Sequence, residues 1–206
     1  ESLAELQFLD RQAGPIRDLL EERSMWGPGG IESRSRPMDY LIRLASAPRA
    51  LVIHGNYLGA EELEFLATQP RRMALIYCPR THAYFEHPPY PLARALALGV
   101  RIALGTDSRA SNPDLCLLTE IRTAHRQHPT VAPASILRMG TWSGAEALGM
   151  GEIAGTLSPG KLANLAAVPS TGSPAGDPVA DLVGGTEPVS HIWIGGEEVP
   201  RSAVTR

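Results

Sequence analysis

The hydrophobic and polar positions of this chain form short apolar runs separated by longer amphipathic segments. Apolar runs bounded by turn residues predict three strands, at residues 50–54, 73–78 and 101–106. Apolar residues at helical spacing predict helices at 2–12, 15–23, 38–46, 59–68 and 91–98. The stretch between residues 78 and 91 is rich in proline and is expected to be a loop. Because strands that alternate with helices indicate βαβ units, we predict an α/β protein with a parallel sheet.

The second half of the chain is predicted to begin with helices and to end with strands. Asn112 followed by Pro113 has the pattern of an N-cap and a first helical residue. The apolar stripe that follows predicts a helix that ends near Arg126. The later segments are predicted to be the helices 133–139 and 143–148 and the strands 162–168, 189–194 and 197–199. The final part is therefore expected to be a small β module beside the α/β part.

Each of the three predicted α/β strands ends at a residue that can carry chemistry: His54, Cys78 and Asp107. In α/β barrels the catalytic groups lie at the carboxyl ends of the strands. A lone aspartate is more often a turn former or a helix N-cap, and a lone histidine is more often structural. Three strands that end alike nevertheless favour a function. We therefore predict that His54 and Asp107 belong to a metal or proton-transfer site.

Other residues are weaker candidates. His82 and His87 are five residues apart in the proline-rich stretch, which does not match the spacing of two metal ligands on a helix, so we predict substrate contacts rather than metal binding. Cys78 is expected to be a small residue at a strand end rather than a nucleophile. The remaining histidines are predicted to be structural, with the first two at a helix end where a cation is favourable: His125, His128 and His191.

Composition excludes several classes of function. The chain has 206 residues, of which 43% are hydrophobic and 20% charged, with a net charge of -3, which is typical of a globular protein with a sizeable core. No basic run indicates nucleic-acid binding, and no apolar run approaches the roughly 18–20 residues of a membrane helix. The two cysteines do not form a disulfide framework, so a reducing, cytoplasmic location is expected.

The first residues predict that this chain is a piece of a longer protein. Ser2 and Glu5 form the pattern of a capping box, so a helix starts at once with no strand before it. An α/β protein is not expected to begin in this way. The simplest explanation is a chain cut just after a strand.

Four motifs together resemble the amidohydrolase superfamily in their order and spacing. They are the segments 54–56, 78–80, 104–108 and 153–164. The branch most similar to them contains chlorohydrolases and the deaminases of guanine, cytosine and adenosylhomocysteine. This resemblance implies the C-terminal part of a (β/α)8 TIM barrel, strands six to eight, in residues 1–150. A small β-sandwich segment would follow in residues 151–206.

The resemblance also implies a role for individual residues. Asp107 would be a metal ligand and proton acceptor, Glu1 a proton shuttle, and His54 the group that orients the water or polarises the substrate ring. Ser111 would touch the substrate. Asn164 stands where the family usually has an aspartate, which affects only a structural contact. The implied cofactor is one divalent metal ion, with zinc preferred and iron as the alternative, bound weakly or not at all by this chain because the family's histidine ligands are missing.

The function implied is a metal-dependent hydrolase that deaminates an amino-heterocycle or an adenosine-like nucleoside, with an aminodeoxyfutalosine-like substrate among those considered. Two alternatives stay open. One is an aromatic chlorohydrolase of the same family, and the other is a non-catalytic half-barrel that binds a partner. The partner predicted for the enzyme is a small-molecule substrate, the parent protein is expected to be a homo-oligomer, and the chain alone is expected to be inactive.

Overall fold

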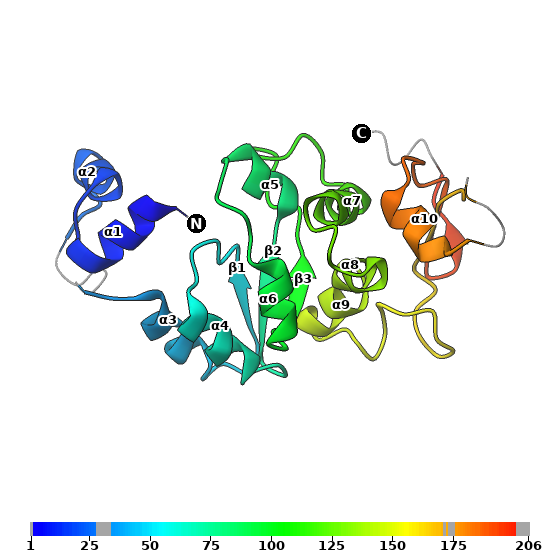
Figure 1. Ribbon diagram of the computed structural model, residues 1–206, viewed down its shortest axis with the longest axis horizontal. Coiled ribbons are helices and arrows are strands. Elements are labelled where there is room, and N and C mark those ends of the chain that lie inside the picture. Colours follow the sequence, from blue (N-terminus) through cyan, green and yellow to red (C-terminus); the bar gives the residue numbers. More distant parts are fainter. Residues whose placement is uncertain (1, 28–33, 171, 173–175, 201–206) are drawn as a thin grey trace. The chain divides into compact units, whose positions relative to one another are not determined.

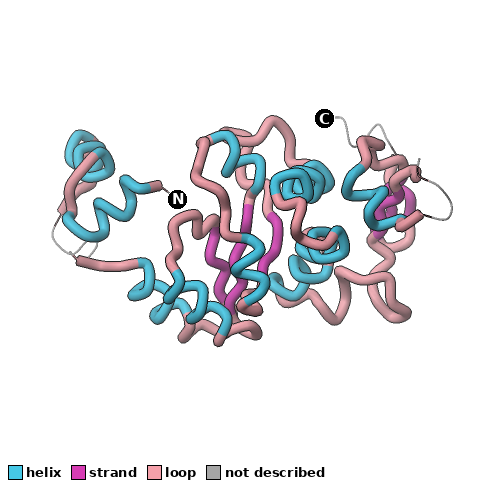
Figure 2. Tube along the Cα trace, viewed as in Figure 1, coloured by secondary structure: helices cyan, strands magenta, loops and turns pink. Residues whose placement is uncertain are grey.

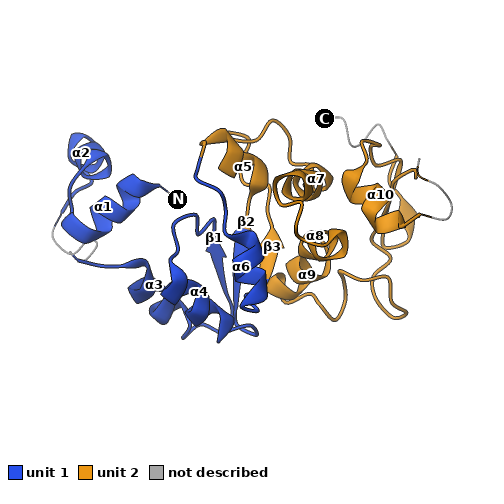
Figure 3. Ribbon diagram, in the orientation of Figure 1, with its two compact units in different colours: residues 1–76, 87–101 blue, residues 77–86, 102–206 orange. Residues whose placement is uncertain are grey.

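The structure is a computed structural model that describes residues 2–27, 34–170, 172 and 176–200. The chain divides into two compact units, which Figure 3 shows in different colours. Unit 1 contains residues 1–76 and 87–101, and unit 2 contains residues 77–86 and 102–206.

Unit 1 carries most of the helices and strands in the first half of the chain, which are labelled in Figure 1. Its elements are α1 (Leu3–Arg11), α2 (Pro15–Glu22), α3 (Pro37–Leu44), β1 (Ala50–Ile53), α4 (Ala60–Ala67), α6 (Leu92–Ala97) and the first four residues of β2 (Met73–Tyr77). The capping box predicted for the first helix is present, because Ser2 and Glu5 exchange hydrogen bonds between side chain and backbone. This exchange explains why α1 begins where the sequence predicts.

Unit 2 carries the remaining helices and strands; Figure 2 draws helices in cyan and strands in magenta. Its elements are α5 (Pro79–Tyr84), β3 (Ile102–Leu104), α7 (Leu117–Gln127), α8 (Pro133–Met139), α9 (Trp142–Leu148), β4 (Leu165–Ala167), α10 (Pro178–Gly184), β5 (His191–Ile194) and β6 (Glu197–Glu198). The helices α7, α8 and α10 pack against one another. Their buried apolar residues include Ile121, Ile136 and Val183.

The described strands form two sheets. The first has the strand order β1-β2-β3, and β1 pairs in parallel with β2 from Ala50 opposite Met73 to Ile53 opposite Ile76. The strand β2 is almost entirely buried, as expected for a strand covered on both faces of a parallel sheet. The second sheet is antiparallel with the order β4-β5-β6, and Gly195 and Gly196 form its tight turn with positive φ angles of 61° and 87°.

The structure confirms the α/β class and contains strands near the C-terminal end, and it corrects three details. The stretch predicted as a loop contains the helix α5, which Pro79 starts at a first-turn position where a missing N–H is tolerated. The helix α7 starts at Leu117, so Asn112 is not its N-cap. The helix α10 was not predicted, although Asp177 caps it and Pro178 follows as its first residue. The assignment to barrel strands six to eight and the division at residue 150 stay predictions.

No helix in the described ranges is long and apolar enough to cross a membrane. The expectation of a cytoplasmic location stays a prediction.

Candidate active site

Asp107 follows β3 in a backbone conformation that side chains disfavour. Its φ angle is +56°, in the left-handed region, and its side chain is exposed. The Oδ1 atom accepts a hydrogen bond of 2.7 Å from the N–H of Ser108. An aspartate tolerates this region better than most residues, so a turn former is one explanation. Strained residues also cluster at active sites, which fits the predicted chemical role of Asp107 at a strand end.

Ser111 lies beside this carboxylate. Its Oγ is 3.4 Å from Oδ2 of Asp107 and 3.0 Å from Oγ1 of Thr81, and only 6% of Ser111 is exposed. The two hydroxyl groups therefore form a short chain of hydrogen bonds that ends at Asp107. The structure gives Ser111 a clear contact with Asp107, whereas its contact with a substrate stays a prediction.

The loop that carries Asp107 is held by polar residues that were not predicted as functional. Nδ2 of Asn112 donates to the carbonyl of Thr106 and to Oε1 of Glu120, at 2.7 and 2.6 Å. Glu120 is completely buried, and this burial raises the pKa of its carboxyl group. The signal in the sequence was a glutamate next to Ile121 in an apolar helical stripe.

Arg80 connects the same loop to the start of α5. Its guanidinium group makes two hydrogen bonds to Asp114, of 2.7 and 3.4 Å, and these bonds hold the pKa of Asp114 below its usual range. Its backbone N–H donates to Oε2 of Glu120 at 3.0 Å. The residue thus links the segment after β2 with the segment after β3 inside unit 2.

His54 is the corresponding strand-end residue in unit 1. It also has a positive φ angle, +61°, and its side chain is half-buried. Its N–H donates to the carbonyl of Ile76 and its carbonyl accepts from the hydroxyl of Tyr90, both at 2.8 Å. The next residue, Gly55, has a φ angle of +63°, and a Cβ there would lie 2.5 Å from Cδ1 of Leu75. Any other residue directly after His54 would be strained and crowded, so glycine is favoured there.

The two candidate substrate residues lie against tyrosines in separate units. His82 is buried on α5 in unit 2, with its ring edge-on to Tyr77 at a centroid distance of 5.7 Å. His87 belongs to unit 1, where its Nδ1 is 3.0 Å from the hydroxyl of Tyr57. These contacts orient both imidazoles, and their role toward a substrate stays a prediction.

A buried tyrosine revises the interpretation of His128. The Tyr77 hydroxyl donates to Oε1 of Gln127 at 2.7 Å and lies 3.2 Å from Nε2 of His128. Burial raises the pKa of Tyr77 and lowers the pKa of His128. His128 lies at the C-terminal end of α7 as predicted, but its burial favours the neutral form rather than the cation expected for the helix dipole.

The described residues do not contain a complete metal centre. No group of three or more histidine, cysteine, aspartate or glutamate side chains in the described ranges could hold an ion together. The carboxylate of Asp107 has the right chemistry for one ligand, because aspartate oxygens are among the groups that bind zinc in proteins. Glu1, which is also predicted to be catalytic, lies outside the described residues.

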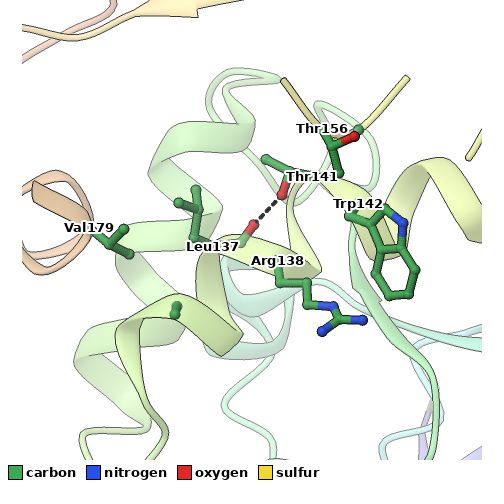
Figure 4. Close-up of a pocket in the computed structure, with 8 residues that line it drawn as sticks. Leu137, Arg138, Thr141, Trp142, Thr156 and Val179 are labelled. Atoms are coloured by element: carbon green, nitrogen blue, oxygen red, sulfur yellow. Dashed lines mark hydrogen bonds between the residues drawn. The ribbon is translucent and has the colours of Figure 1, made fainter. Parts of the chain in front are cut away.

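Unit 2 also contains a surface pocket. It has a volume of about 420 Å³ and is lined by residues of α8, α9, α10 and the 155–156 segment (Figure 4). The guanidinium of Arg138 lies 3.9 Å above the ring of Trp142. None of the candidate residues lines the pocket, so it is not the candidate active site.

A structural contact in the C-terminal sheet explains why Asn164 is tolerated. Its Oδ1 accepts a hydrogen bond of 2.8 Å from the N–H of Gly195, at the turn between β5 and β6. An asparagine oxygen can make this contact as an aspartate oxygen would.

Comparisons with known proteins identify similar sequences. The sequence profile of the amidohydrolase family matches residues 18–199. A 5-methylthioadenosine/S-adenosylhomocysteine deaminase of Teredinibacter turnerae is 30% identical over 184 residues, which cover 83% of this chain and 41% of that protein. A 5'-deoxyadenosine deaminase of Methanothermobacter thermautotrophicus is 34% identical over 137 residues, which cover 63% of this chain and 31% of that protein. The chain thus matches less than half the length of these relatives.

Solved structures have a similar fold. An adenosine deaminase from Xanthomonas campestris with bound zinc has a TM-score of 0.71 at 28% identity, over 80% of this chain and 40% of that chain. Aminofutalosine deaminase of Helicobacter pylori has a TM-score of 0.76 at 22% identity, over 97% of this chain and 50% of that chain. The third structure is a mutant atrazine chlorohydrolase from Arthrobacter aurescens TC1 complexed with zinc and atraton. It has a TM-score of 0.66 at 23% identity, over 79% of this chain and 38% of that chain. The last two similarities show the fold alone.

Proposed function

Because this chain belongs to the amidohydrolase family, we propose that the full-length protein is a metal-dependent hydrolase that deaminates an amino-heterocycle of the adenosine-like nucleoside class. The observation that carries the proposal is the placement of His54 and Asp107. Both follow a strand of the first sheet, and both have left-handed backbone conformations. The names of the relatives, which include deaminases of methylthioadenosine and 5'-deoxyadenosine, support this class of substrate.

Hydrolytic deamination requires a few proton transfers. The oxygen of a water molecule bonds to the ring carbon that carries the amino group, the bond from this carbon to the nitrogen breaks, and ammonia leaves. In our proposal the carboxylate of Asp107 accepts a proton of the attacking water, and Glu1 relays a proton to the ring nitrogen and to the leaving amine, which departs as ammonia. The imidazole of His54 stabilises the charge that develops on the substrate. Ser108 and Ser111 keep the Asp107 carboxylate in one orientation through their hydrogen bonds.

The proposed cofactor is a divalent metal ion, with zinc preferred. Such an ion lowers the pKa of a bound water molecule and so supplies a hydroxide near neutral pH. Asp107 would hold it as one ligand, and the remaining ligands would come from the part of the full-length protein that this chain does not contain. For the same reason we propose that the chain alone is inactive.

The site is tested in the full-length protein with Asp107→Ala and His54→Ala. We expect the first variant to lose turnover, because it removes a proton acceptor and a metal ligand together. The second should lower kcat by roughly 100-fold or more, the scale of a lost acid–base or electrostatic group. Ammonia release would be measured with adenosine, methylthioadenosine, S-adenosylhomocysteine, 5'-deoxyadenosine and aminofutalosine as substrates.

The matched control is Asp18→Ala, which removes an exposed carboxylate on α2 and should retain wild-type activity. Near-normal activity of either site variant would show that the site is assigned wrongly. A wild-type protein that releases chloride from a chlorotriazine, but no ammonia from any nucleoside, would be a chlorohydrolase instead. A protein with no hydrolase activity that binds a partner would support the non-catalytic alternative.

A further inference from the structure

Glu120 is a fully buried carboxylate, and the proposed chemistry does not use it. It lies on α7 with 0% of its surface exposed. A carboxylate in such a place is costly unless hydrogen bonds and charges compensate for the lost water. Both of its oxygens accept hydrogen bonds, and Nε of Arg80 lies 3.8 Å from Oε1. These donors explain how Glu120 is accommodated, and they come from two other segments of unit 2.

The first donor is the side chain of Asn112, which is 2% exposed. Its Nδ2 carries two hydrogens, and each has a partner: Oε1 of Glu120 at 2.6 Å and the carbonyl of Thr106 at 2.7 Å. Rotating the amide by 180° would turn its oxygen toward these two acceptors. Oδ1 of Asn112 instead faces the N–H of Asp114, at 3.4 Å. The chemistry of the surroundings therefore permits one orientation of this amide.

The second donor is the backbone N–H of Arg80, 3.0 Å from Oε2 of Glu120. Arg80 is the second residue of α5, so this N–H is one of those that a helix leaves without a partner in its own backbone. Glu120 thus satisfies the start of α5 with one oxygen. Its other oxygen, Oε1, accepts a hydrogen bond from the side-chain amide of Asn112, which also donates to the carbonyl of Thr106, directly before Asp107.

We propose that Glu120 is a positioning residue for Asp107, acting through Asn112 on the carbonyl of Thr106. The bond at Thr106 sets the peptide unit that joins Thr106 to Asp107, whose φ angle of +56° has to be maintained by its surroundings. The inference rests on the proposed function for the chemical role of Asp107. Its geometric part concerns only the segment from residue 105 to residue 112.

This role requires a carboxylate and not merely a side chain of the same size. Glutamine at position 120 would replace one acceptor oxygen by an NH₂ group. That group would face either Nδ2 of Asn112 or the N–H of Arg80, so two donors would meet. The variant Glu120→Gln should therefore release one of the two connections although the volume of the side chain is nearly unchanged.

The test is hydrogen exchange of the full-length protein, measured by mass spectrometry over residues 105–112. Glu120→Gln and Asn112→Ala should each raise the exchange rate of this segment by about tenfold, the scale of one lost charged hydrogen bond. The exchange of α8, in the same unit, should change by less than about twofold. The matched control is Glu64→Gln, an exposed residue on α4, which should leave both segments unchanged.

Two results of the exchange experiment would overturn the inference. One is unchanged exchange over residues 105–112 in a folded variant. The other is an equal increase over this segment and α8, which would mean that Glu120 supports the whole unit rather than the loop before Asp107. If Glu120→Gln does not fold, Asn112→Ala decides alone, because it leaves the bond between Glu120 and Arg80 in place.

A kinetic measurement separates this inference from the proposed function. If the wild-type protein deaminates a nucleoside, Glu120→Gln should lower kcat about tenfold and change KM by less than about threefold, since it displaces a reacting group and not a binding contact. Unchanged kcat in the folded variant would contradict the positioning role. If the wild-type protein shows no hydrolase activity, the proposed function fails, and the exchange rates still decide whether Glu120 orders the loop.

Discussion

At the scale of single residues, His54 and Asp107 are unusual because both are strand-end residues with positive φ angles and reactive side chains. A non-glycine residue in a sparsely populated conformation costs of order 1–3 kcal/mol, so neighbours have to maintain it. Tyr90 donates to the carbonyl of His54, and Asn112 donates to the carbonyl before Asp107. The backbone beside each of these two residues is therefore held by a buried polar side chain.

His128 should make stability depend on pH. Its pKa is lowered by burial in the folded state, so the unfolded chain binds the proton more readily. This contribution to stability is complete above the ordinary pKa of about 6.5 and is lost as the pH falls from there toward the lower folded value. We expect the melting temperature of the wild type to fall as the pH is lowered from about 7.5 to about 5.5. The melting temperature of His128→Gln should fall less over the same interval.

Circular dichroism melts at several pH values would measure this effect. Thr130→Ala is the control, because this exposed residue near the end of α7 carries no titratable group and its replacement should leave the pH dependence as in the wild type. Identical pH profiles of the wild type and His128→Gln would contradict the prediction.

At the scale of elements, two hydrogen bonds join the segment after β1 to the segment before α6 in unit 1. The Tyr90 hydroxyl donates to the carbonyl of His54 at 2.8 Å, and the Tyr57 hydroxyl lies 3.0 Å from Nδ1 of His87. Because Tyr90 is buried, its hydroxyl competes little with water for the carbonyl. The two bonds thus hold the turn that carries His54.

Tyr90→Phe should weaken this connection. The ring stays in its buried position, but the carbonyl of His54 loses this donor, which should lower the free energy of unfolding by about 1–2 kcal/mol. Urea unfolding would measure the change, with Tyr84→Phe as the control because Tyr84 is exposed on α5. Equal stabilities of the two variants would mean that the Tyr90 hydroxyl does not support the turn.

At the scale of the whole molecule, metal binding should distinguish the chain of 206 residues from the full-length protein. Protein zinc sites use three or four ligands, and the described part of this chain contains no group of three that could hold an ion. We expect the purified chain to contain far less than one equivalent of zinc, and the full-length protein to contain about one. Elemental analysis after dialysis against a chelator measures both; stoichiometric zinc that the chain retains would refute the prediction.

The sequence by itself determined the alternation of strands and helices and the strand ends at His54 and Asp107. These features are local, because hydrophobic periodicity and turn residues act over a few positions. The motifs around the same residues also indicated the amidohydrolase family, which the family profile confirms over residues 18–199. The individual roles of the site residues remain predictions.

Only the tertiary structure decided what holds these residues. Asn112 follows the rule for a helix N-cap, yet its amide is used between Thr106 and Glu120, and α7 starts five residues later, at Leu117. Glu120 pairs with a backbone N–H 40 residues earlier in the chain. Such pairs depend on which distant segments the fold brings into contact and on how completely it removes water from them. A pattern of neighbouring residues carries neither quantity.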